Sequence, residues 1–173
     1  MKEGKHMTIK YTTFNNEPKE FSGWVKTFLN GTHEVMEIPN KTFYQQAEEL
    51  VQTGIDCVAV SGTYAYYETV YDALDYLILT FIEEHKLDEE ETLANIHHTL
   101  VAKNIDYGNS FDNVVDLMGL PGAVIRILDK FNRLKTLQGA AGEVGDESTV
   151  DTELDFIGYL MLTLHYYQDK KEG

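Results

Sequence analysis

Apolar residues recur at steps of three and four along most of the chain, which is the spacing of amphipathic helices. Residues suited to helix ends bound these stretches. Thr42 with Gln45 and Asp88 with Glu91 fit capping boxes, and Pro121 suits a first helical turn. We therefore predict helices over residues 15–31, 42–54, 63–85, 88–103 and 146–167, a short helix ending at Met118 and a helix that begins at Pro121. For residues 55–60 we predict either a strand or a helical or extended link.

Five to seven helices with short connections favour an all-α helical bundle. The last two helices are separated only by the glycine-rich loop from Gly139 to Asp146, so we expect them to pack as an antiparallel pair. A length of 173 residues and an apolar content of 43% suit a well-buried core. We divide the chain into an N-terminal helical region, residues 1–90, and a helical domain, residues 91–173, and expect both to form one compact unit.

The C-terminal helix carries three carboxylates at four-residue steps, Glu147, Asp151 and Asp155. This spacing places them near one helix face. Asp155 lies in a stretch that is otherwise almost wholly apolar, where a solvated charge is not expected. Because a buried carboxylate without a cation is costly, we predict that these three acids bind Mg²⁺.

The preceding helix carries a charged stripe opposite its apolar face, formed by Arg126, Asp129, Lys130 and Arg133. Alone, such a stripe is typical of a solvated surface. Packing of the last two helices would bring it towards the three acids. We then expect the bases to bind phosphate oxygens and Asp129 to join the acids. The alternative is an internal salt-bridge network of the same acids and bases.

The predicted catalytic residues are Asp129, Glu147, Asp151 and Asp155, with a magnesium-activated water as the nucleophile. The predicted substrate-binding residues are Lys103, Asp106, Tyr107, Arg126, Lys130 and Arg133. Among these, Lys103, Asp106 and Tyr107 lie next to Gly108, where a nucleobase could stack on the tyrosine ring. The alternative for this segment is a turn whose tyrosine simply packs.

Composition excludes several classes of protein. Lys and Arg number 14 against 29 Asp and Glu, a net charge of −15, which argues against binding to a nucleic acid polymer. No apolar run approaches the roughly 20 residues of a membrane span. The single cysteine, Cys57, excludes an internal disulfide and fits the reducing cytoplasm. His97 and His98 are adjacent, so they point in different directions on a helix and do not favour a zinc site.

Three blocks of residues carry a family resemblance. They resemble the pattern of the nucleotide modification associated domain, found largely in phages and prophages, over roughly residues 93–168. This resemblance implies handling of modified or selected nucleotides during phage infection, hence in the host cytoplasm. The blocks are Lys103, Asn104, Asp106, Tyr107, Gly108, Ser110 and Phe111; Arg126, Asp129, Lys130, Asn132, Arg133 and Leu134; and Asp146, Glu147, Ser148, Asp151, Thr152 and Asp155.

The chain is more distantly similar to the all-α nucleoside triphosphate pyrophosphatases of the MazG and dimeric dUTPase kind. That similarity implies magnesium-dependent cleavage of a triphosphate to monophosphate and pyrophosphate by acids on two neighbouring helices. Asp151 and Asp155 match the second of those helices. The first departs from the pattern, since Arg126 and Asp129 stand where two glutamates three residues apart are expected.

We therefore expect a cytoplasmic protein that binds a nucleotide through Mg²⁺ and hydrolyses a phosphoanhydride bond. One alternative is a non-enzymatic phage protein that binds a nucleotide or blocks a host protein through its acidic surface. Another is a structural bundle in which acids and bases pair internally. An apolar last helix and exposed aromatic residues are also compatible with a homodimer.

Overall fold

The computed structural model describes the backbone of residues 5–7, 20–30, 33–35, 40–107, 110–139 and 146–172, and the side chains of residues 23–29, 40–104, 110–139 and 149–168. Seven helices make up nearly all of these ranges, which confirms the all-α prediction. They are α1 (Glu20–Asn30), α2 (Phe43–Ala59), α3 (Thr63–Glu84), α4 (Glu89–Tyr107), α5 (Ser110–Met118), α6 (Leu120–Gly139) and α7 (Asp146–Glu172). Two short antiparallel strands, β1 (Lys5–Met7) and β2 (His33–Val35), pair with His6 opposite Glu34.

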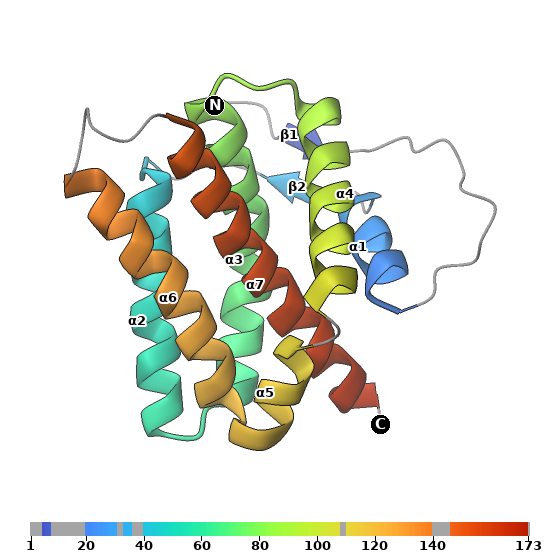
Figure 1. Cartoon of the computed structure of the whole chain (residues 1–173), viewed down its shortest axis with the longest axis vertical. Coiled ribbons are helices and arrows are strands. Elements are labelled where there is room, and N and C mark those ends of the chain that lie inside the picture. Colours follow the sequence, from blue (N-terminus) through green and yellow to red (C-terminus); the bar gives the residue numbers. More distant parts are fainter. Residues whose placement is uncertain are drawn as a thin grey trace.

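Four helices form a closed ring around the core. In this ring α2 packs on α3, α3 on α7, α7 on α6 and α6 on α2. Figure 1 shows the four helices filling the body of the molecule, with α1 and α4 along one side and α5 at one end. The contact between α6 and α7 is the most extensive between helices in the described chain. The predicted packing of this pair is confirmed, whereas its antiparallel direction stays a prediction.

Local side-chain contacts start two helices where the sequence predicts. The Thr42 hydroxyl accepts a hydrogen bond from the Gln45 N–H at 3.1 Å, and the Gln45 side chain accepts one from the Thr42 N–H at 3.0 Å. The Asp88 carboxylate accepts one from the Glu91 N–H at 2.9 Å before α4. These bonds satisfy N–H groups that have no partner within the helix, so both predicted caps are confirmed.

Replacing Thr42 by alanine is expected to lower the free energy of unfolding by about 1 kcal/mol, because the first turn of α2 loses its capping acceptor. Urea unfolding followed by circular dichroism measures the change. Thr53→Ala, in the middle of α2, is the matched control. It should leave stability the same or slightly higher, and an equal loss in both variants would contradict the capping role.

Three predicted helix ends are wrong. The predicted end at Gly54 is passed by α2, which continues to Ala59, because Gly54 is buried at a close helix contact. A Cβ there would lie 3.1 Å from Cζ of Tyr66. Residues 55–59 are therefore helical. Beyond the predicted end at Lys103, α4 continues to Tyr107, and α7 continues beyond Tyr167. Residues 15–19 of the predicted first helix lie outside the described residues.

One large core joins the two halves of the chain. Its aromatic centre is Phe43 of α2, whose ring lies 6.3 Å from that of Phe81 and 6.0 Å from that of Phe156. The same cluster includes Val25 of α1 and Leu164 of α7, so residues before and after position 91 pack together. Within the described ranges, no helix combines the length and the apolar character that crossing a lipid bilayer requires.

Candidate functional site

A cleft opens where α4, α5, α6 and α7 meet. It encloses about 570 Å³ of empty space, including space open to solvent. Its walls combine charged, polar and apolar side chains, which is the mixture expected of a site for a small molecule. The lining residues are Leu100, Lys103 and Asn104 of α4, Ser110 of α5, Lys130 of α6, and Asp155, Gly158, Tyr159 and Leu162 of α7.

Asp155 is the electrostatic centre of this cleft. Its Oδ1 accepts a hydrogen bond from Nζ of Lys103, and its Oδ2 lies 3.1 Å from Nζ of Lys130. The side chains of Asp155 and Lys130 are only 21% and 24% exposed, so these charges are partly removed from water. Two ammonium groups from different helices thus meet one carboxylate, leaving an excess of positive charge.

The rest of the cleft provides an aromatic and apolar wall. Nζ of Lys130 lies 5.7 Å from the centre of the Tyr159 ring, within the range of a cation–π contact. Tyr159 follows Asp155 by four residues, so one face of α7 presents both. Gly158 lets α4 approach α7, because a Cβ at this position would lie 2.5 Å from Cδ2 of Leu100.

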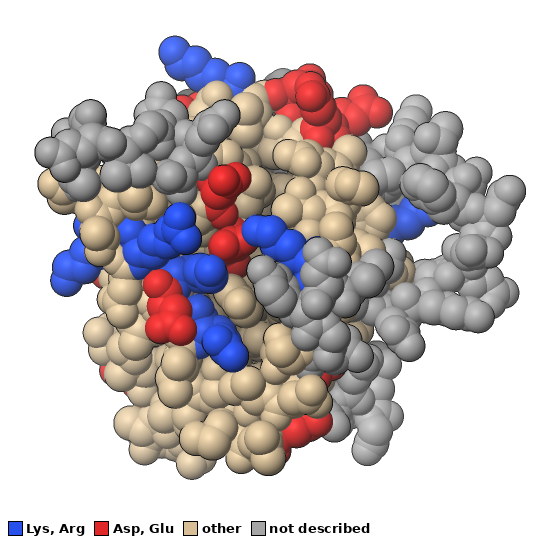
Figure 2. Space-filling model, in the orientation of Figure 1, with Lys and Arg blue, Asp and Glu red and all other residues tan. Residues whose placement is uncertain are grey.

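Positive charge is concentrated on α6. This helix carries Arg126, Lys130, Arg133 and Lys135 against a single acid, Asp129, a local charge of +3 in a chain of net charge −15. Figure 2 shows basic and acidic side chains gathered over α6 and α7 on one face. Among the described residues, no ion pair joins Arg126 or Arg133 to a carboxylate.

The structure brings only part of the predicted site together. Lys103, Lys130 and Asp155 meet in the cleft. Asp151 is exposed one turn before Asp155 on α7, and Asp129 is exposed on α6. The backbone places Asp106 and Tyr107 in the last turn of α4 and Glu147 in the first turn of α7, but their side chains lie outside the described residues.

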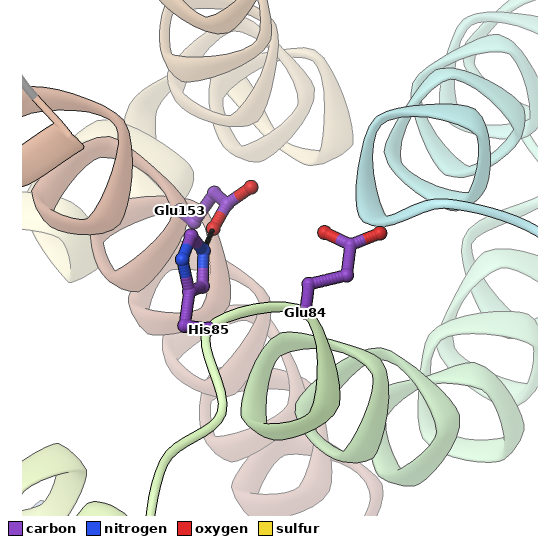
Figure 3. Close-up of side chains that lie close together, drawn as sticks. All are labelled: Glu84, His85 and Glu153. Atoms are coloured by element: carbon purple, nitrogen blue, oxygen red, sulfur yellow. Dashed lines mark hydrogen bonds and ion pairs between the residues drawn. The ribbon is translucent and has the colours of Figure 1, made fainter.

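A second cluster, formed by Glu84, His85 and Glu153, lies between the end of α3 and α7. Each residue offers one ligand atom, and these atoms all lie within 4.8 Å of one another, so the group can hold a metal ion. Nε2 of His85 lies 2.5 Å from Oε2 of Glu153. Figure 3 shows His85 against Glu153, with the Glu84 carboxylate facing them across a gap.

The Glu153 carboxyl is 5% exposed, and burial raises its pKa above the ordinary 4.5. The hydrogen bond and the charge of His85 act in the opposite direction, while the charge of Glu84 adds to the increase. Because the folded state holds this proton more tightly than the unfolded state, the associated stability is full below pH 4.5 and is lost as pH rises through the raised pKa.

Glu153→Gln is therefore expected to increase the free energy of unfolding at pH 7, since a neutral amide replaces a buried carboxylate and can still accept a hydrogen bond from His85. The gain should disappear below pH 4.5, where the glutamic acid is protonated. Chemical unfolding at several pH values, with EDTA present, measures both effects. Glu48→Gln, at an exposed position of α2, is the control and should show no such pH dependence. A variant less stable than the unaltered protein at pH 7 would contradict this reasoning.

Sequence reasoning missed the apolar wall of the cleft and the whole second cluster. The four-residue step from Asp155 to Tyr159 could have indicated the first. No spacing could have indicated the second, because His85 and Glu153 are 68 residues apart. His97 and His98 of α4 are neighbours in the sequence but take no part in this cluster, which uses His85 directly after α3.

Comparison of the chain with protein-family models, with curated proteins and with solved structures finds no significant match in any of the three. The resemblance to nucleotide modification associated domains and to MazG-like pyrophosphatases therefore stays a prediction from the quoted residues.

Proposed function

We propose that the cleft between α4, α5, α6 and α7 binds a nucleotide through its phosphate groups. The observation that carries this proposal is the convergence of Lys103 and Lys130, from two helices, on Asp155 inside the cleft. The ammonium group of Lys130, whose side chain is 24% exposed, attracts an anion more strongly than one on an open surface, and Lys103, at 42% exposed, adds a second positive charge. The net charge of −15 makes such a concentration of bases more notable, because the rest of the surface repels phosphates.

The surrounding residues suit the remainder of a nucleotide. Arg126 and Arg133 lie one turn to either side of Lys130 on α6, where their planar guanidinium groups can bind further phosphate oxygens in pairs. Tyr159 offers a ring, and Leu162 an apolar surface, to a base. Tyr107 remains a predicted second contact for the base.

Magnesium fits the acids next to this cleft. Mg²⁺ in nucleotide sites is held by one or two carboxylates together with substrate phosphates. Asp151 and Asp155 are four residues apart on α7 and can supply that pair, with Glu147 and Asp129 as further predicted ligands. Ligation by Asp155 requires Lys103 and Lys130 to release it and turn towards the phosphates. When bound, the ion would neutralise charge that develops on the phosphoryl group.

We further propose hydrolysis of a phosphoanhydride bond in phage nucleotide metabolism, which rests on the sequence resemblance together with this arrangement of acids and bases. Purified protein with Mg²⁺ should release pyrophosphate from at least one member of a panel of standard and modified deoxynucleoside triphosphates. EDTA should stop the release. An absence of product with every nucleotide would refute hydrolysis, while a parallel binding titration would still test the nucleotide site.

Asp155→Asn separates the catalytic role from a structural one. In the hydrolase, the loss of a magnesium ligand should abolish turnover, whatever the change in stability. In a bundle that merely pairs its charges, the variant should lose up to about 3 kcal/mol of stability, because Lys103 and Lys130 lose their partner. Turnover assays beside urea unfolding measure both effects, with Asp72→Asn, at an exposed position of α3, as a control outside the cleft. Full magnesium-dependent turnover by Asp155→Asn would exclude this residue from catalysis.

A nucleotide-binding protein without catalytic activity is the second candidate. The observation that favours it is the engagement of both Asp155 oxygens by lysines, which leaves the carboxylate less free to ligate a metal. This candidate predicts binding without product. A calorimetric titration, with chromatography of the same sample for product, distinguishes the two.

A further inference from the structure

We infer that Glu84, His85 and Glu153 form a binding site for a divalent transition-metal ion of the Zn²⁺ type. The site is separate from the cleft, and the inference does not depend on the proposed nucleotide function. It uses different side chains and a different class of ion. Three observations support it: the way the three side chains are held, the unmatched carboxylate oxygens, and the chemistry of the ligand set.

His85 and Glu84 are held in place by groups outside the cluster, and Glu153 is held by its hydrogen bond to His85. The turn after α3 is closed by a hydrogen bond of 3.0 Å from the Leu87 N–H to the Ile82 carbonyl. His85 lies at this turn, with its ring edge-on to Phe81 at 5.0 Å. The Glu84 carboxylate accepts a hydrogen bond from the Phe43 N–H at 2.9 Å. Preorganised ligands of this kind lose little freedom when an ion binds.

The two carboxylates carry more negative charge than their described partners neutralise. Glu153 is 5% exposed, and only its Oε2 has a partner among the described residues, His85. Oε1 of Glu84 accepts the Phe43 N–H, and no described group donates to its second oxygen. Two carboxylates directed at one gap repel each other unless a cation lies between them. A divalent ion there would satisfy both free oxygens.

One imidazole nitrogen with two carboxylates is a ligand set suited to zinc. Imidazole favours Zn²⁺ and related ions over Mg²⁺, and three protein ligands leave a fourth position for water. Two ligands on one zinc ion lie at most about 4.2 Å apart, twice a bond of about 2.1 Å. The separations of up to 4.8 Å therefore require only a small side-chain adjustment. The ion replaces the proton shared between Nε2 of His85 and Oε2 of Glu153, and that proton is released to solvent.

The test is a calorimetric titration of the full chain with Zn²⁺, and separately with Mg²⁺. We expect one Zn²⁺ per chain, bound at least about tenfold more tightly than Mg²⁺. His85→Ala should weaken Zn²⁺ binding by at least about tenfold. Glu84→Gln should weaken it as well, and it keeps an acceptor for the Phe43 N–H, so the fold is preserved. His98→Ala, an exposed histidine on α4, is the control and should bind as the unaltered protein does.

Bound Co²⁺ provides a spectroscopic check, because its visible absorption changes when a nitrogen and carboxylates replace water. The change should appear in the unaltered protein and be lost in His85→Ala. Binding of Zn²⁺ no tighter than of Mg²⁺ would overturn the inference. Unchanged Zn²⁺ affinity in both His85→Ala and Glu84→Gln would also overturn it, as would loss of affinity in His98→Ala alone.

Discussion

Lys130→Met is expected to weaken the binding of a deoxynucleoside triphosphate by at least about tenfold, or about 1.4 kcal/mol. Lys130 supplies one of two ammonium groups in the cleft, and a hydrogen bond to a charged group is worth about 1.5–3 kcal/mol. Methionine keeps an apolar stem of similar length against Tyr159, so packing should be largely preserved. Asp155 also retains Lys103 as a partner, which limits the cost to the fold.

The matched control is Lys135→Met. Lys135 lies on the same helix and is exposed, but it does not line the cleft. Both variants lose one positive charge, so any difference between them reports a local contact rather than the overall field. Calorimetric titration measures both. Equal losses in the two variants would show that α6 attracts nucleotides only through its general charge, and would remove Lys130 from the site.

Phe156→Ala is expected to cost about 3–5 kcal/mol of stability and to lower the Tm by roughly 10 °C. The Phe156 side chain is fully buried and lies edge-on to Phe43 between α2 and α7. Its removal leaves a cavity where three aromatic rings meet. Differential scanning calorimetry measures the change.

Leu117→Ala provides the control for this core substitution. Leu117 is 84% exposed on α5, so its truncation should change stability by less than about 0.5 kcal/mol. If Phe156→Ala also changed stability by so little, the packing of α7 against α2 and α3 would be contradicted. That packing positions Asp155 and Tyr159 in the cleft, so the candidate site depends on it.

The sequence predicts most helices because their signals are local. The caps at Thr42 and Asp88 act within three residues, and the apolar spacing of each helix is visible in a single window. The wrong end at Gly54 has a tertiary cause. A glycine that follows an amphipathic stretch is typical of a helix end, but here its missing side chain makes room for the Tyr66 ring of α3.

The candidate site was only partly predictable, because several of its contacts depend on tertiary structure. Periodicity could place Lys130 and Asp155 on facing stripes, because their two helices are neighbours in the chain. The sequence predicts Lys103 beside a turn that binds a nucleobase, whereas its contact with Asp155 joins residues 52 apart. Glu84 and His85 meet Glu153 only through the packing of α3 against α7. Such contacts follow from tertiary structure, which single-sequence patterns do not contain.

We propose that this cleft is a nucleotide site. The most direct measurement is a calorimetric titration of the unaltered protein with a panel of deoxynucleoside triphosphates, with and without Mg²⁺. We predict one nucleotide bound per chain, with higher affinity when Mg²⁺ is present, and loss of that binding when Lys103 and Lys130 are both replaced by methionine. An absence of binding by every nucleotide, or equal binding by the double variant, would contradict the claim.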